Sequence, residues 1–171
     1  VESLRVERDA GVDEAEGRDD LLLVDQLLRD LGADLVLGLV VTLDDLDRSR
    51  ALRTPAELRE LVEAIRDSPP DSQETNWVEW KSSLDLSSKE GRFSIARAVL
   101  GFANREVTLA SNVFEGVAYM VVGAEPGAVA GVTVIDSAKL EQGVRTYLDG
   151  PRWTPHYVQV DGKDVLVVAV D

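Results

Sequence analysis

The stretch from Glu74 to Asn104, ETNWVEWKSSLDLSSKEGRFSIARAVLGFAN, decides the fold. It opens with a segment typical of a strand, Asn76 to Lys81, in which successive side chains point to opposite faces of the sheet. Trp77, Glu79 and Lys81 are therefore expected on one face, and Val78 and Trp80 on the other. Apolar residues then recur at helical spacing up to Ala103, and Ser87 and Ser88 are N-cap residues for that helix. Two carboxylates and a lysine thus accompany a strand-to-helix unit.

The rest of the chain supplies further strands and helices around this unit. Val117–Val122, Val129–Val134, Tyr157–Val160 and Val165–Val170 are predicted as strands, and the last two flank a hairpin turn at Asp161-Gly162-Lys163. A second helix is predicted from Ser137 to about Leu148. This order predicts an α+β fold with a mixed, mostly antiparallel sheet and helices on one side.

The N-terminal part is more acidic and is predicted to add helices. Thr54-Pro55-Ala56-Glu57 is a capping box that begins a helix from Pro55 to Arg66. A helix over Leu21–Leu31 and a buried strand or helix over Leu35–Leu43 are also expected. Ser68-Pro69-Pro70-Asp71-Ser72 is the best candidate boundary. We therefore expect an acidic extension with helices and a strand over 1–68, and a main domain over 74–171.

Composition narrows the class of protein. The chain has 171 residues, no cysteine, a single histidine and a net charge of −14. The absence of cysteine excludes disulfides and thiolate metal sites. The acidic charge disfavours generic nucleic-acid binding, although the part after residue 70 is closer to neutral. No apolar run is long enough for a membrane span and no leader opens the chain, which predicts a cytoplasmic protein.

The carboxylates suggest a metal site. Glu74 and Glu79, joined by Glu125 just past the strand Val117–Gly123, would hold a divalent cation through oxygen ligands, and Lys81 would contact a phosphate. Solvated or paired strand-end residues are the commoner alternative. Arg92, Arg97 and Arg105 are candidates for a phosphate path, and the three tryptophans for base stacking or, more often, for the core.

The same stretch resembles the Schlafen AlbA-type domain family, whose bacterial members are labelled DNA-binding or ATP-binding. The similarity lies in Glu74-x4-Glu79-x-Lys81, the helix end Gly101-Phe102-Ala103-Asn104 and the strand Tyr119-Met120-Val121-Val122-Gly123, and it covers roughly 74–171. The family's Gly-Gly pair is here Glu115-Gly116, and its Gly-Val-Asp-Asp is Gly-Ala-Glu-Pro.

The resemblance implies a Schlafen AlbA-like fold with an N-terminal helical extension and a metal-dependent endonuclease acting on RNA or DNA with Mg²⁺ or Mn²⁺. The implied catalytic residues are Glu74, Glu79, Lys81 and Glu125, of which the three glutamates bind the metal. Nucleotide contacts are implied for Asn104, Gly116 and Gly123. A homodimer is expected, with the Leu21–Leu43 region in its contact. The alternatives are a non-catalytic nucleic-acid or nucleotide-binding module and an oligomerisation module of a longer protein.

Overall fold

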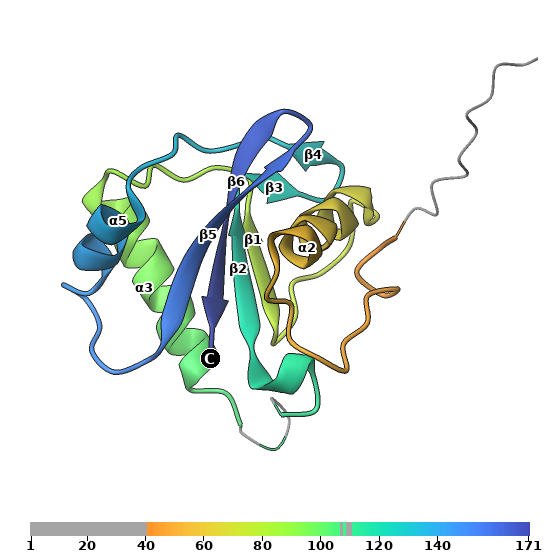
Figure 1. The fold of residues 1–171 in the computed structure, drawn as a ribbon, viewed down its shortest axis with the longest axis horizontal. Coiled ribbons are helices and arrows are strands. Elements are labelled where there is room, and N and C mark those ends of the chain that lie inside the picture. The colour runs from red at the N-terminus through yellow and green to blue at the C-terminus, as the bar shows by residue number, and fades with distance from the viewer. Residues whose placement is uncertain (1–40, 107, 109–110) are drawn as a thin grey trace, which may run out of the picture. The chain divides into compact units, whose positions relative to one another are not determined.

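A computed structural model describes residues 41–106, 108 and 111–171 (Figure 1). The helix predicted over Leu21–Leu31, and with it most of the dimer contact expected over Leu21–Leu43, lies outside these residues. So does most of the segment predicted over Leu35–Leu43. Its described end, Val41–Leu43, forms coil and the start of a turn.

The centre of the fold is a four-stranded sheet in the order β1-β2-β6-β5. The strands β1 and β2 are parallel, and the other two pairs are antiparallel. This confirms the α+β class and the mixed, mostly antiparallel sheet. The strands are β1 (Val78–Lys81), β2 (Ala118–Val122), β5 (Trp153–Val160) and β6 (Lys163–Val170).

Helices cover both faces of this sheet, so the prediction of helices on one side was wrong. The helix α2 packs on one face, and α3 and α5 pack on the other (Figure 1). The cause is β2, in which every residue is buried. A strand that is apolar on both faces needs cover on both. The helices are α2 (Pro55–Asp67), α3 (Lys89–Ala103) and α5 (Ser137–Val144).

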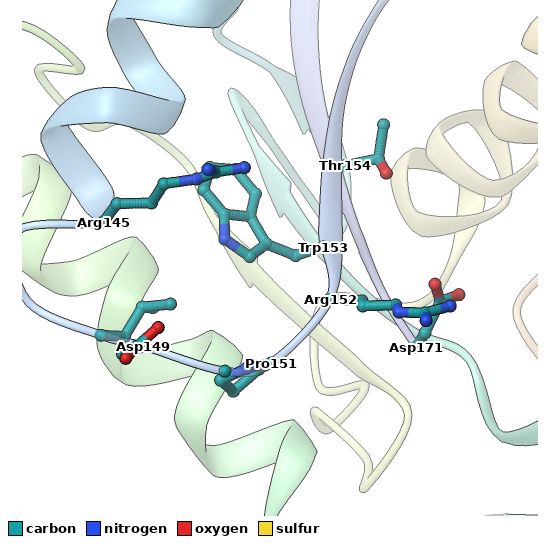
Figure 2. A pocket seen from close by; sticks show the side chains of 9 residues that line it. Arg145, Asp149, Pro151, Arg152, Trp153, Thr154 and Asp171 are labelled. Carbon is teal, nitrogen blue, oxygen red and sulfur yellow. The ribbon is translucent and has the colours of Figure 1, made fainter.

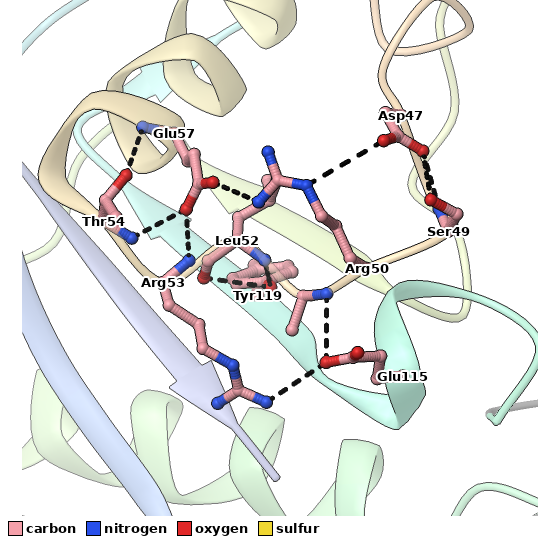
Figure 3. A network of polar contacts seen from close by, with 10 residues as sticks. Asp47, Ser49, Arg50, Leu52, Arg53, Thr54, Glu57, Glu115 and Tyr119 are labelled. Carbon is pink, nitrogen blue, oxygen red and sulfur yellow. Dashed lines mark hydrogen bonds and ion pairs between the residues drawn. The ribbon is translucent and has the colours of Figure 1, made fainter.

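The start of α2 is fixed by the predicted capping box. The Thr54 side chain accepts a hydrogen bond from the Glu57 N–H, and the Glu57 carboxylate accepts one from the Thr54 N–H at 2.8 Å (Figure 3). The bond from the Thr54 N–H, followed by those from the Arg50 side chain and the Arg53 N–H, lowers the pKa of Glu57 to about 2. Although α2 precedes the predicted boundary, it belongs with the sheet to one compact unit, Val40–Asp171.

A buried tyrosine ties the segment before α2 to the sheet. The Tyr119 hydroxyl on β2 accepts a hydrogen bond from the Leu52 N–H at 2.7 Å and donates one to the Leu52 carbonyl oxygen at 3.2 Å (Figure 3). Burial raises the pKa of Tyr119 to about 12. The phenol therefore stays neutral at pH values at which a tyrosine in the unfolded chain ionises.

This pairing predicts a loss of stability at alkaline pH. The folded pKa of Tyr119 lies above its ordinary value of 10.0. The contribution of Tyr119 to the free energy of unfolding is therefore complete below pH 10 and falls as the pH rises towards 12. Tyr119→Phe should lower stability by about 1–3 kcal/mol at neutral pH, because the Leu52 groups lose their partner. It should also show a smaller further loss above pH 10. Urea unfolding at pH 8 and above pH 10 measures both effects, and equal alkaline losses in the two proteins would contradict the assignment.

The strand predicted over Val129–Val134 was also wrong. A two-residue strand β4 (Ala128–Val129) pairs with β3 (Ala124–Glu125) in a separate hairpin, and residues 130–136 form no strand. Gly131 has φ +81°, which turns the chain away from an extended path. Its N–H bonds the Gly123 carbonyl at 2.8 Å, and the Val132 N–H bonds the Asp164 carbonyl at 2.8 Å. These are isolated hydrogen bonds at the end of the sheet and do not form the repeating ladder of a strand.

Candidate functional site

Glu74, Glu79 and Lys81 line a hollow of about 430 Å³ between β1 and α3. We call this the β1–α3 hollow. Asn76 and two arginines, Arg97 from α3 and Arg105 after its end, complete its polar lining. Sequence reasoning thus found the two glutamates and the lysine, and its less specific arginine candidates included two that belong here. It missed Asn76, because no periodic pattern marks a residue in the turn before a strand.

The predicted alternation holds throughout β1 but not for Trp77, which precedes the strand. Glu79 and Lys81 lie on the α3 face, whereas Val78 and Trp80 pack in the core beneath α2. Trp77 joins that core too, against the prediction that it shares a face with Glu79. It precedes the strand proper and packs on Phe114, with ring centroids 4.8 Å apart.

The ammonium of Lys81 lies between the two carboxylates. Its Nζ is 3.0 Å from Glu79 Oε1 and 3.3 Å from Glu74 Oε1. Partial burial works against the charged form, but the hydrogen bonds and charges of Glu79 and Glu74 outweigh it and raise the pKa of Lys81. The two acids therefore share one cation from the chain itself, which offsets one of their two negative charges.

Glu74 and Lys81 also close the free edge of β1. Glu74 Oε1 accepts from the Trp80 N–H at 3.0 Å, and Lys81 Nζ donates to the Trp80 carbonyl at 3.1 Å. Thr75 does the same for Val78, since its N–H donates to the Val78 carbonyl at 3.0 Å and its Oγ1 accepts from the Val78 N–H at 3.2 Å. The backbone groups on this edge thus have partners, which gives Glu74 a structural role.

Arg105 joins three segments at one end of the hollow. Its guanidinium donates to the carbonyl oxygens of Phe102 at 2.7 Å, Asn76 at 3.0 Å and Gly116 at 2.7 Å. Burial lowers its pKa from the usual value. Because its bonds go to neutral carbonyls, its positive charge is not cancelled by a carboxylate among the described residues. The Phe102 bond places this charge at the C-terminus of α3, where the helix dipole favours a cation.

Glu125 does not join the other two glutamates. It is exposed on the β3–β4 hairpin, which lies beside α2 through a 2.7 Å bond from the Gly127 N–H to the Arg66 carbonyl. The β1–α3 hollow opens on the other face of the sheet. Among the described residues, no group of three or more acidic or histidine side chains is placed to hold a metal ion. The three predicted metal ligands therefore do not converge in this arrangement.

The residues expected to contact a nucleotide lie apart. Asn104 Nδ2 donates to the Leu100 carbonyl at 2.8 Å and closes the end of α3. Gly116 ends the short 3-10 helix η1 (Phe114–Gly116) just before β2, whereas Gly123 follows β2. The five-residue strand between them spans about 16 Å, so the two glycines lie at opposite ends of it.

Two other hollows have less suitable linings. One, of about 450 Å³, lies between α5 and β5, and its lining holds two arginines, Arg145 and Arg152, and an equal number of aspartates, Asp149 and Asp171 (Figure 2). The other, of about 730 Å³, lies at the start of α3. Its described lining holds the acids Asp85 and Glu90 and no lysine or arginine. The β1–α3 hollow, with three cations and two carboxylates, is the better site for an anion.

Comparisons with protein-family models, curated proteins and solved structures found no match. The fold and the hollow together define an α+β protein with a mixed sheet and a charged site beside its β1 edge. No helix in the described ranges has the length and apolar character needed to cross a membrane.

Proposed function

We propose that residues 74–171, packed with α2 in one compact unit, form a cytoplasmic, Schlafen AlbA-type nucleic-acid-binding module that holds a phosphate of RNA or DNA in the β1–α3 hollow without cleaving the strand. The observation that carries this proposal is the gathering of Lys81, Arg97 and Arg105 in one hollow of a chain whose net charge is −14. The resemblance described for 74–171 favours the same class of ligand.

Arg97 is the residue best placed to contact the phosphate. Lys81 is held by two glutamates and Arg105 by three carbonyls. Arg97 is exposed on α3 and forms no ion pair within the described residues. A planar guanidinium binds phosphate oxygens in a bidentate manner, which favours an arginine in this role.

Binding of labelled single-stranded RNA, single-stranded DNA and tRNA, followed by fluorescence anisotropy, tests this function. Arg97→Gln should weaken binding of every sequence several-fold and reduce the slope of log affinity against log salt by about 1. The matched control is Arg59→Gln, which removes an equal charge from an exposed position on α2, across the sheet. Equal binding by the two variants, or no binding by the wild type at low salt, would refute the proposal.

Metal-dependent cleavage is the second candidate, because Glu74 and Glu79 already share one cation, Lys81. A divalent ion that displaced the ammonium would find two carboxylates in place, and such an ion activates water. The same binding assays with Mg²⁺ or Mn²⁺ report cleavage as shorter products. Products made by the wild type and absent with Glu79→Gln would favour this candidate. Binding without products would favour the non-catalytic module.

A further inference from the structure

The two edges of the sheet are finished differently. At β1 the outward backbone groups of Val78 and Trp80 bond to Glu74, Thr75 and Lys81. At the other edge, β5 is twice as long, with eight residues against four. A long open edge strand is a template for pairing with another strand.

The hairpin geometry shows which groups of β5 face outward. The two-residue turn Asp161–Gly162 has positive φ at both residues and closes on the pair Val160–Lys163, which is hydrogen-bonded in such hairpins. Bonded pairs recur at every second residue. The Asp171 N–H bonds the Arg152 carbonyl at 3.1 Å and continues this even-numbered pattern. The backbone therefore turns outward at the odd-numbered residues Trp153, Pro155, Tyr157 and Gln159.

These outward groups have no backbone partner among residues 41–106, 108 and 111–171, where β5 ends the strand order. Pro155 fits this orientation, because it has no N–H to give to β6. Three N–H donors and four carbonyl acceptors on this edge thus lack a backbone partner among the described residues; Gln159 is exposed, Trp153 and Tyr157 are half-buried, and Pro155 is buried.

The β5 strand also carries no formal charge at neutral pH. Its sequence, WTPHYVQV, has no acidic or basic residue except His156, whose pKa is lowered by burial. Two copies of a chain with net charge −14 repel each other over most of their surfaces. An uncharged strand that meets its own copy places no like charges opposite each other.

We propose that β5 pairs with β5 of a second copy, antiparallel and about a two-fold axis near His156, so that two sheets become one. In this register Trp153 lies opposite Gln159 of the partner subunit, and Pro155 lies opposite Tyr157 of the partner subunit. Pro155 then supplies only its carbonyl, and the remaining outward donors find acceptors. This surface lies away from the β1–α3 hollow at the other edge, so the proposal stands independently of the proposed function.

Light scattering of the full 171-residue chain tests the pairing with two substitutions at one position. Gln159→Pro removes an outward N–H, whereas Gln159→Thr removes the same side chain and keeps the N–H. The side chain is exposed and, within the part of the chain that the structure describes, bonds only Asp164 on β6. We expect the wild type and Gln159→Thr to form a dimer. The dimer of Gln159→Pro should be weaker by about tenfold or more. A wild type that stays at 18.6 kDa up to millimolar concentration, or a dimer unaffected by Gln159→Pro, would overturn the proposal.

Amide hydrogen exchange of the wild type gives a second test that needs no variant. The Tyr157 and Gln159 amides should exchange more slowly as protein concentration rises, because they are bonded only in the dimer. The His156 and Val158 amides, which face β6, should stay protected at every concentration. If the Tyr157 and Gln159 amides are protected equally at every concentration, the edge is covered within one chain. That result would overturn the proposed pairing with a second copy.

Discussion

Gly91→Ala is expected to destabilise the protein by about 3 kcal/mol or more, although alanine is the better helix former. A Cβ at Gly91 would lie 2.0 Å from the Asp85 carbonyl oxygen, a distance that no real contact allows. That oxygen cannot move freely, because it accepts hydrogen bonds from Ser88 Oγ at 2.8 Å and from the Ser88 N–H at 3.2 Å. The substitution therefore forces the first turn of α3 away from the loop that precedes it.

Chemical unfolding of Gly91→Ala beside Gly101→Ala measures this effect. Gly101 lies in the same helix, and a Cβ there meets nothing within 4 Å. Gly101→Ala should therefore be neutral or stabilise the protein by up to about 1 kcal/mol. Because α3 forms one wall of the β1–α3 hollow, Gly91→Ala should also weaken any ligand binding there. Similar stability of the two variants would show that the contact at Asp85 is relieved without strain.

Phe114→Ala is expected to remove about 3–5 kcal/mol of stability. Phe114 is fully buried, and its ring lies 4.8 Å from that of Trp77 and 5.5 Å from that of Tyr119. Its N–H also donates to the Arg48 carbonyl at 2.7 Å, which ties the turn before β2 to the segment before α2. Truncation leaves a cavity between these aromatic rings.

The matched control is Phe93→Ala, the same change at an exposed position. Phe93 is 53% exposed on α3 and contacts the Tyr147 ring edge-on at 5.5 Å. Its loss should change the free energy of unfolding by about 0.5 kcal/mol. Urea unfolding of both variants at one pH compares the two values. Losses of similar size would mean that Phe114 is not the centre of the aromatic cluster.

Local signals in the sequence predicted α2, α3, α5 and the turn between β5 and β6. The Thr54 capping box begins α2, and Ser88 caps α3 by accepting from the Gly91 N–H at 2.9 Å. Asp161 and Gly162 form the turn in left-handed conformations. These features depend on residues within about four positions of each other, so a short stretch of sequence contains the physics that determines them.

Tertiary structure decided the site and the layers around it. The spacing of Glu74 and Glu79 predicted that they lie near Lys81, but not that Glu74 bonds the β1 edge. The spacing also did not predict that Glu125 is exposed beside α2. Arg105 bonds the Asn76 carbonyl 29 positions away, and Tyr119 bonds Leu52 67 positions away. Such contacts form only when the whole sheet and its two helical layers are in place. A long stretch of chain between two residues does not by itself hold them at a fixed distance.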